Sequence, residues 1–152
     1  MYTPKRYIPS QLSRKDRKKQ LSMIRKSKRL YKKNRFYQRE KLSSFHSKKS
    51  GHIVTAEKMY GVDSIQPNNT LSRKTGCSVA ALKKIVNKGQ GAYYSSGSRP
   101  NQTAQSWGLA RLASAITSGK AAAVDFNIID KGCDHNKKAY KLALKQKTRK
   151  NS

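Results

Sequence analysis

Residues 71–89 read LSRKTGCSVAALKKIVNKG and predict two helices joined by a turn. A short helix over residues 71–74 is followed by Gly76, and Ser78 is a favourable N-cap for a second helix. The second helix has one apolar face and is expected to end at Gly89. That face consists of Val79, Leu82, Ile85 and Val86. The spacing therefore predicts a helical hairpin.

The same hairpin is similar to a helix-turn-helix, in which the start of the second helix enters the major groove of DNA. The residues at those positions are Ser78, Ala80, Ala81 and Lys84. Two alanines offer little for direct base readout, which usually uses Arg, Asn or Gln. We therefore slightly favour a packing hairpin without DNA contact. Any DNA contact made here is expected to be to phosphates, with little sequence preference.

The rest of the middle of the chain is also expected to be helical. A short helix is predicted near residues 56–60, with a strand over residues 53–54 as the alternative. A loop rich in Gly and Ser is predicted over residues 90–101. Further helices are predicted over residues 103–118, 121–130 and 135–147. The expected fold class is mainly α: the hairpin plus two or three further helices.

Positive charge is distributed unevenly along the 152 residues, which carry 35 Lys and Arg against 7 Asp and Glu, a net charge of +28. Residues 1–52 carry a net +16, residues 53–136 a net +5, and residues 137–152 a net +7. These segments predict a basic N-terminal arm, a small helical domain and a basic C-terminal helix or tail. Self-repulsion at this charge opposes compactness, so a polyanionic partner is expected.

The basic arm is expected to contain one amphipathic helix and an extended segment. Ser13 can cap the helix, with Asp16 three residues later as a capping-box variant. Residues 34–51 are expected to be extended, with a solvated, partly disordered tail as the alternative. Four aromatic side chains are predicted to be apolar anchors for a partner: Tyr31, Phe36, Tyr37 and Phe45.

The residues expected to contact a polyanion or a partner are Lys and Arg side chains of the arm, the hairpin and the Gly-rich loop. They are Arg14, Lys15, Arg17, Lys18, Arg25, Lys28, Lys32, Arg35, Arg39, Lys48, Lys49, Lys83, Lys84 and Arg99. Residues 89–103 carry three glycines, several hydroxyls and one Arg, and could form a backbone nest for an anion. They lack P-loop spacing, and we prefer a structured surface loop whose tyrosines pack over the core.

Catalytic and metal chemistry have little support in the sequence, and no cofactor or small-molecule substrate is expected. Cys133 and His135 are two residues apart, but no second ligand pair accompanies them. Asp125, inside an apolar stretch, is expected to form a structural salt bridge, with Arg111 as the candidate partner. An active site would need Asp125, His135 and Arg99 together. Cys77 and Cys133 are expected to be reduced thiols in an intracellular compartment.

Targeting signals are not visible in the sequence either. The first ten residues, MYTPKRYIPS, are basic but have no apolar core, which is unlike a secretory signal. No apolar run approaches the ~20 residues that a bilayer-spanning helix needs.

Several stretches resemble a family of small basic proteins from large nucleocytoplasmic DNA viruses, notably algal viruses. Residues 88–117 read KGQGAYYSSGSRPNQTAQSWGLARLASAIT, and residues 75–86 read TGCSVAALKKIV. The arm contributes YIPSQLSRKDRKKQ, LYKKNRFYQR and SFHSKKSGHIV. The resemblance extends from Tyr7 to about Leu144. It implies a viral setting, namely a protein of the virion, and transfers no catalytic residues.

Resemblance and charge together predict a structural virion protein made in the host cytoplasm. The first expectation is a minor capsid protein on the inner face of an icosahedral shell. Its expected partners are the major capsid protein and other minor capsid proteins, with viral DNA or the inner membrane surface as further candidates. The alternative is a packaged DNA-binding protein that condenses the genome without sequence preference. The third and least favoured hypothesis is an enzyme that acts on nucleic acid.

Overall fold

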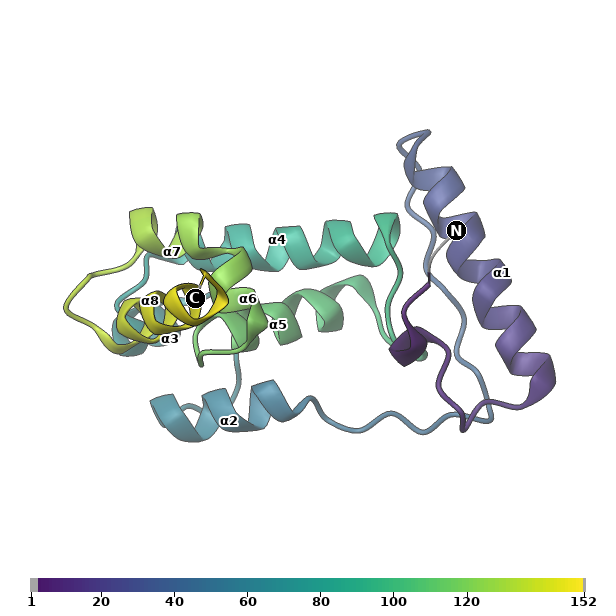
Figure 1. The fold of residues 1–152 in the computed structure, drawn as a ribbon, viewed down its shortest axis with the longest axis horizontal. Helices are drawn as coiled ribbons and strands as arrows, with labels where there is room; N and C mark the ends of the chain where they lie inside the picture. Colours follow the sequence, from purple (N-terminus) through teal and green to yellow (C-terminus); the bar gives the residue numbers. More distant parts are fainter. Residues whose placement is uncertain (1–2, 152) are drawn as a thin grey trace. The chain divides into compact units, whose positions relative to one another are not determined.

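The computed structural model describes residues 3–151, with side chains for residues 3–149, and is mainly helical as predicted (Figure 1). A short 3-10 helix, Lys5–Tyr7, precedes the α-helices. The α-helices are α1 (Arg14–Tyr31), α2 (Gly51–Tyr60), α3 (Asn69–Thr75), α4 (Val79–Ser95), α5 (Ala104–Ala115), α6 (Lys120–Val124), α7 (Phe126–Gly132) and α8 (Lys138–Asn151). The predicted helix near residues 56–60 is therefore confirmed, and the alternative strand over residues 53–54 is wrong.

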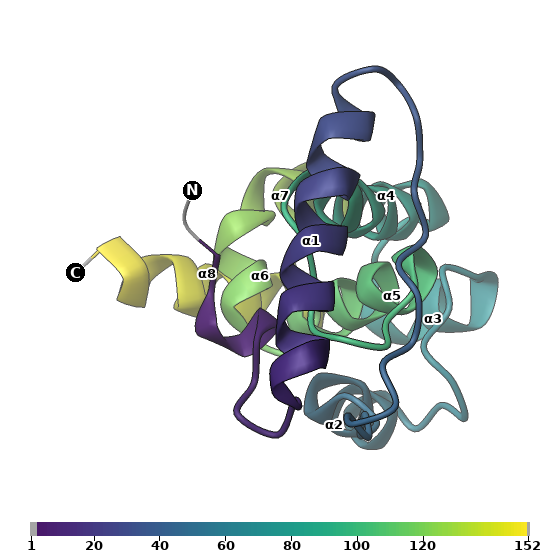
Figure 2. The ribbon, with the colours of Figure 1, turned by 90° about the vertical axis from the view of Figure 1, so that its right-hand side faces the viewer.

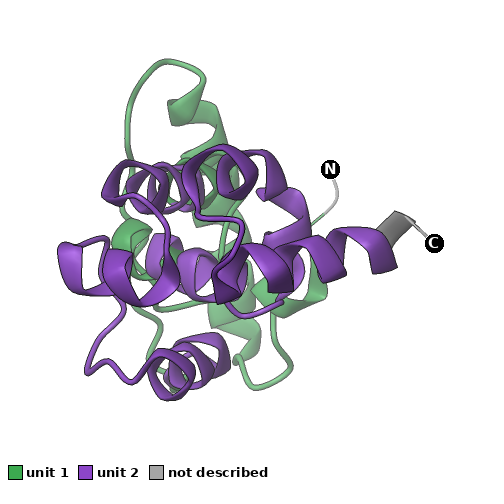
Figure 3. Cartoon of the chain, turned by 90° about the vertical axis from the view of Figure 1, so that its left-hand side faces the viewer, with its two compact units in different colours: residues 1–48, 90–107 green, residues 49–89, 108–152 purple. Residues whose placement is uncertain are grey.

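The chain forms two compact units, coloured separately in Figure 3. Unit 1 contains Met1–Lys48 and Gln90–Trp107, and unit 2 contains Lys49–Gly89 and Gly108–Ser152. The three segments expected from the charge distribution do not coincide with these units, because most of the predicted arm packs with the Gly-rich stretch of the middle. Unit 1 carries 18 basic and 2 acidic side chains, a net charge of +16.

In unit 1, α1 buries one face and its N-terminus is capped as predicted. The Asp16 N–H donates to the Ser13 hydroxyl over 3.1 Å. Ile24 is fully buried, and its Cγ2 would lie only 3.2 Å from a Cβ placed on Gly97, whose φ of +112° also favours glycine. The chain then turns and runs back alongside α1 as an irregular segment (Figure 2). Its Leu42 packs with side chains from α1 and from the N-terminal residues.

In unit 2, the predicted hairpin is confirmed as α3, a turn and α4. The Asn68 side chain accepts the Leu71 N–H over 3.0 Å and caps α3. Gly76 ends α3 in the left-handed conformation, with φ +82°, as its position in the sequence predicted. The Ser78 hydroxyl accepts the Ala81 N–H over 3.1 Å at the start of α4. The capping residues therefore fix where both helices of this hairpin begin, and Gly76 fixes where α3 ends.

The predicted end of α4 at Gly89 is wrong, because the helix continues through Gly89 and Gly91 to Ser95. Gly89 serves a packing role instead: a Cβ on it would lie 2.6 Å from the Cα of Gly108 in α5. Figure 1 shows α4 and α5 running side by side. Tertiary packing here outweighs the cost of about 1 kcal/mol for a glycine inside a helix.

The single helix predicted over residues 121–130 is two helices, α6 and α7, which meet at Asp125. Asp125 has φ −99° and ψ 19°, outside the helical region. α7 ends against the hairpin, where a Cβ on Gly132 would lie 2.4 Å from the Cβ of Ala81. Ala81 is therefore covered, although the helix-turn-helix reading placed it at the DNA. This favours the packing interpretation of the hairpin.

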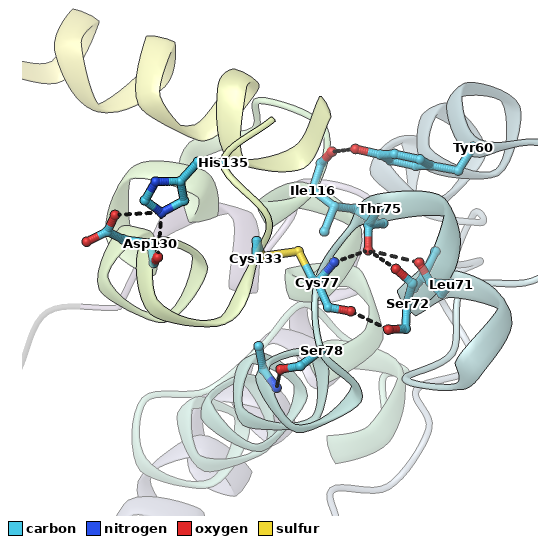
Figure 4. Close-up of a disulfide and its surroundings, with 11 residues drawn as sticks. Tyr60, Leu71, Ser72, Thr75, Cys77, Ser78, Ile116, Asp130, Cys133 and His135 are labelled. Carbon is cyan, nitrogen blue, oxygen red and sulfur yellow. Dashed lines mark hydrogen bonds and ion pairs between the residues drawn. A yellow bond between two sulfur atoms is a disulfide. The ribbon is translucent and has the colours of Figure 1, made fainter. Parts of the chain in front are cut away.

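A disulfide joins Cys77 and Cys133 in unit 2, so the expectation of reduced thiols is wrong for this structure (Figure 4). The cysteines are 56 residues apart in sequence, and a single β-bridge brings them together. Two backbone hydrogen bonds flank the bond: the Ser78 N–H donates to the Gly132 carbonyl and the Asp134 N–H to the Gly76 carbonyl, each over 2.8 Å. The disulfide therefore joins the turn of the hairpin to the end of α7.

Candidate polyanion-binding surface

Four cations share one face of α1, and we call them the cationic stripe. They are Arg14, Lys18, Arg25 and Arg29. At ~100° per residue, these positions fall within an arc of about 60°, and they span about 22 Å of helix. All four are exposed, and the side chains on the opposite face are buried. Amphipathic spacing therefore turns a basic sequence into a continuous row of charge.

The stripe is not neutralised within the part of the chain that the structure describes. None of its four side chains has an ion pair or hydrogen bond among residues 3–149. Unit 1 has two carboxylates, and both are engaged elsewhere: Glu40 lies 2.8 Å from Lys19, and Asp16 accepts hydrogen bonds from Ser44. Like charges on one face repel, so an external anion is expected to lower the energy of this surface.

Asp16 holds the irregular segment that follows α1 through hydrogen bonds from Ser44. Its Oδ2 accepts the Ser44 hydroxyl over 2.5 Å and the Ser44 N–H over 3.1 Å. These hydrogen bonds, the hydroxyl first, lower the pKa of the carboxyl from its usual value. The ionised form of Asp16 is thus the one that holds the segment against α1.

The lowered pKa of Asp16 predicts acid sensitivity of unit 1. The ionised Asp16 carboxylate contributes fully to the free energy of unfolding above the unfolded pKa of about 3.9. This contribution is lost as pH falls through the lower pKa that Asp16 has in the folded chain. We expect Asp16→Asn to be less stable than the unmodified chain at pH 7, and this difference to shrink in acid. Urea unfolding between pH 7 and pH 2 measures it. A difference that stays constant with pH would contradict the assignment.

Arg39, a predicted polyanion contact, is half-buried and makes its hydrogen bonds within unit 1. Its guanidinium donates to the Tyr93 carbonyl and the Ser98 hydroxyl, each over 2.8 Å, and to the Ser27 hydroxyl over 2.9 Å. Its Cζ also lies 3.8 Å from the centre of the Tyr93 ring. Burial lowers the pKa of this guanidinium. Arg39 therefore binds the irregular segment to α1 and to the end of α4.

The other predicted contact residues are mostly at the surface. Lys28 is half-buried, Lys49 lies 2.6 Å from Glu57, and Arg17 donates to the Ser10 carbonyl over 3.2 Å. The remaining ones are exposed: Lys15, Lys32, Arg35, Lys48, Lys83, Lys84 and Arg99. Lys83 and Lys84 belong to unit 2 and the other five to unit 1. Arg14, Lys18 and Arg25 of the cationic stripe belong to the predicted set, whereas Arg29 was not predicted.

The four predicted aromatic anchors divide into two kinds. Tyr37 and Phe45 pack against the cluster of buried side chains around Leu12, inside unit 1. Tyr31 and Phe36 are exposed by 36% and 65% of their surface and pack with a third ring, Tyr94. Sequence reasoning placed Tyr94 in a loop, whereas it lies in the last turn of α4. The sequence showed aromatic residues beside basic ones at Tyr31 and Phe36. It did not show that Tyr94 packs with them.

The residues considered for catalysis have structural partners. The predicted pair is confirmed: Arg111 donates to both Asp125 carboxylate oxygens over 2.8 and 2.7 Å, with the Asp125 side chain fully buried. The His135 ring stacks on Tyr140 with 3.8 Å between ring centres. In residues 89–103, considered above as a possible anion nest, the Ser98 hydroxyl accepts a hydrogen bond from Arg39 and donates one to the Arg99 carbonyl. The polar groups of these residues are therefore engaged in contacts within the fold.

Neither a metal-binding cluster nor a membrane-spanning helix occurs in the described residues. Among residues 3–151, no group of three or more His, Cys, Asp or Glu side chains is placed to hold a metal ion. In the same part of the chain, no helix combines the length and apolar character that crossing a membrane requires.

Comparison with known proteins gives one family. No curated protein matches the chain, and no solved structure does. A family model described as a family of unknown function, DUF5824, matches residues 4–148 and so covers both units. The chain belongs to this family.

Proposed function

We propose that the chain is a non-enzymatic structural protein that binds nucleic acid through phosphate contacts along the cationic stripe. The observation that supports this is the row of four exposed cations on α1, none of which has an ion pair or hydrogen bond among residues 3–149. The net charge of +28 adds a long-range attraction for any polyanion. A capped helix fixed by Asp16 and Arg39 presents this charge without a further folding step.

The expected binding mode is independent of base sequence. A row about 22 Å long is matched by several successive phosphates of a strand, which follow one another at about 3.4 Å along the axis of B-DNA. Contacts with phosphates position a protein but carry no sequence information. Binding is expected to release condensed counterions and to weaken steeply with salt.

Two variants with equal charge test this proposal. The stripe variant replaces Arg14, Lys18, Arg25 and Arg29 by Gln. The hairpin variant replaces the exposed Arg73, Lys74, Lys83 and Lys84 by Gln, so both variants fall from +28 to +24. The hairpin variant removes the charges that the helix-turn-helix reading would use.

The stripe variant is expected to bind a mixed-sequence DNA duplex at least about tenfold more weakly than the unmodified chain at 100 mM salt. The hairpin variant is expected to stay within about threefold. Fluorescence anisotropy with a labelled 30-base-pair duplex measures both, and circular dichroism checks that each variant folds. Equal losses in the two variants would show that only total charge matters, and a larger loss in the hairpin variant would favour a helix-turn-helix.

A minor capsid protein on the inner face of a virion is the second candidate function. It is favoured by the resemblance to proteins of large DNA viruses and by exposed apolar side chains in unit 2. Val124 of α6 is 56% exposed and Leu144 of α8 is 43% exposed. Exposed apolar side chains beside basic ones suit a coat surface that is partly acidic.

Fractionation of virus particles separates the two functions. Particles are treated with nuclease, washed at rising salt, and this protein is followed by mass spectrometry. A capsid protein would stay with DNA-free shells at about 1 M salt, where the Debye length is only ~3 Å. A nucleic-acid-binding protein would leave with the DNA or be removed by moderate salt.

A further inference from the structure

We propose that Tyr31, Phe36 and Tyr94, which we call the aromatic platform, stack on unpaired bases, so that the protein prefers single-stranded nucleic acid. This inference rests on the proposed function and names its substrate class more closely. All three residues belong to unit 1, as does the cationic stripe. The cationic stripe would bind the phosphates of a nucleic-acid strand, and the aromatic platform would stack on its bases.

A tight turn after α1 places Phe36 on this platform. Asn34 adopts the left-handed conformation, with φ +59°. The Arg35 N–H donates to the Leu30 carbonyl over 2.9 Å and the Asn34 N–H to the Tyr31 carbonyl over 3.0 Å. This pair of hydrogen bonds is the Schellman arrangement that ends many helices. It reverses the chain sharply, so that Phe36 meets Tyr31 of the preceding turn.

The three rings hold one another in place. The Phe36 ring centre lies 5.1 Å from that of Tyr94 and 6.1 Å from that of Tyr31. The Tyr31 and Tyr94 rings are nearly parallel, with 8° between their planes and 6.4 Å between their centres. Gln38 donates to the Tyr94 hydroxyl over 2.7 Å and fixes that ring from its edge. The platform is therefore pre-organised, which reduces the entropy lost on binding.

Phe36 remains 65% exposed although it has two aromatic neighbours. The core of unit 1 is built from other residues, around Leu12, Met23 and Leu42. An exposed ring in a fixed position offers a planar face to a ligand. A base has a matching planar face, and stacking is tolerant of base identity.

The charges around the platform identify the ligand as an anion with flat groups. Lys32, Lys33 and Arg35 are exposed within the same turn, and Arg29 ends the stripe two residues before Tyr31. Basic grooves with interleaved aromatic rings are typical of proteins that bind single strands. In a duplex the bases are stacked on one another, so their faces are not available to an external ring. Single-stranded nucleic acid satisfies both the charge and the rings.

The test compares single and double strands with substitutions of Phe36 in the full chain. The probes are a labelled 20-nucleotide oligothymidine and a labelled 20-base-pair duplex. We expect Phe36→Ala to weaken binding of the single strand by about tenfold and to leave duplex binding within about twofold. Phe36→Tyr, which retains the aromatic face, is expected to bind both probes like the unmodified chain. Phe36→Leu, which retains only apolar bulk, is expected to behave like Phe36→Ala.

Each other result overturns the inference in a distinguishable way. If Phe36→Ala binds the single strand normally while the stripe variant does not, the platform is wrong and the proposed function stands. If the unmodified chain binds neither probe, the proposed function fails as well. If Phe36→Ala keeps its nucleic-acid binding but loses binding to poly-glutamate, the platform belongs to an acidic protein partner. Thermal unfolding of each variant confirms that loss of binding does not reflect loss of the fold.

Discussion

Asp125→Ala is expected to lower the free energy of unfolding by about 3–5 kcal/mol, the largest effect of any single substitution considered. The Asp125 side chain is fully buried and accepts two hydrogen bonds from Arg111, whose side chain is 24% exposed. Lys88 adds a weaker contact, with its Nζ 3.8 Å from the carboxylate. Removing the carboxylate leaves the Arg111 guanidinium largely buried and without a counterion.

Urea unfolding of Asp125→Ala measures this loss, and Asp130→Ala is the matched control. Asp130 lies in α7 and has a carboxylate that is 45% exposed, so its removal is expected to cost less than about 1 kcal/mol. The double variant Asp125→Leu, Arg111→Met replaces both charges and is expected to recover most of the loss. A cost below about 1 kcal/mol for Asp125→Ala would show that the pair does not hold unit 2 together.

Reduction of the Cys77–Cys133 disulfide is expected to lower the free energy of unfolding by about 2–4 kcal/mol. The bond closes a loop between cysteines 56 residues apart, and a loop of that length restricts the unfolded chain by about 4 kcal/mol in the chain-entropy description. Cys77 is 1% exposed and Cys133 is 8% exposed, so the folded chain shields the bond from reductant.

Chemical unfolding with and without a strong reductant measures this contribution. The double variant Cys77→Ser, Cys133→Ser is expected to match the reduced chain and to be insensitive to the reductant. Intact-mass measurement of the alkylated, unfolded chain shows whether the bond is present. Two alkylated cysteines without any reductant would show that the thiols are free in the protein as produced, and the stability difference would then vanish.

Local signals allowed the starts of α1 and α4 to be predicted, because capping acts within a few residues. Ser13 and Ser78 cap their helices as predicted, and Gly76 ends α3 as its position predicted. Failures occurred where distant residues decide the backbone. Gly89 is helical because Gly108 packs against it, and no pattern near Gly89 in the sequence carries that information.

The candidate site was predictable to a similar extent. Three of the four stripe residues were among the predicted contacts and Arg29 was missed, whereas the Arg111–Asp125 pair followed from the one acid inside an apolar stretch. Arg39 looks like its basic neighbours in sequence, but it is half-buried and donates hydrogen bonds to Ser98 and Tyr93. Nor did the spacing of Cys77 and Cys133 indicate a disulfide, because the bridge depends on how α7 meets the hairpin.

The salt dependence of duplex binding tests the central claim most directly. If the stripe contacts phosphates, the logarithm of the binding constant should fall with the logarithm of salt concentration at a slope of about −4 or steeper. The stripe variant should show a slope shallower by about 3 to 4, and the hairpin variant the slope of the unmodified chain. Equal slopes for the stripe variant and the unmodified chain would contradict the account, because α1 would then not be the surface that meets the phosphates.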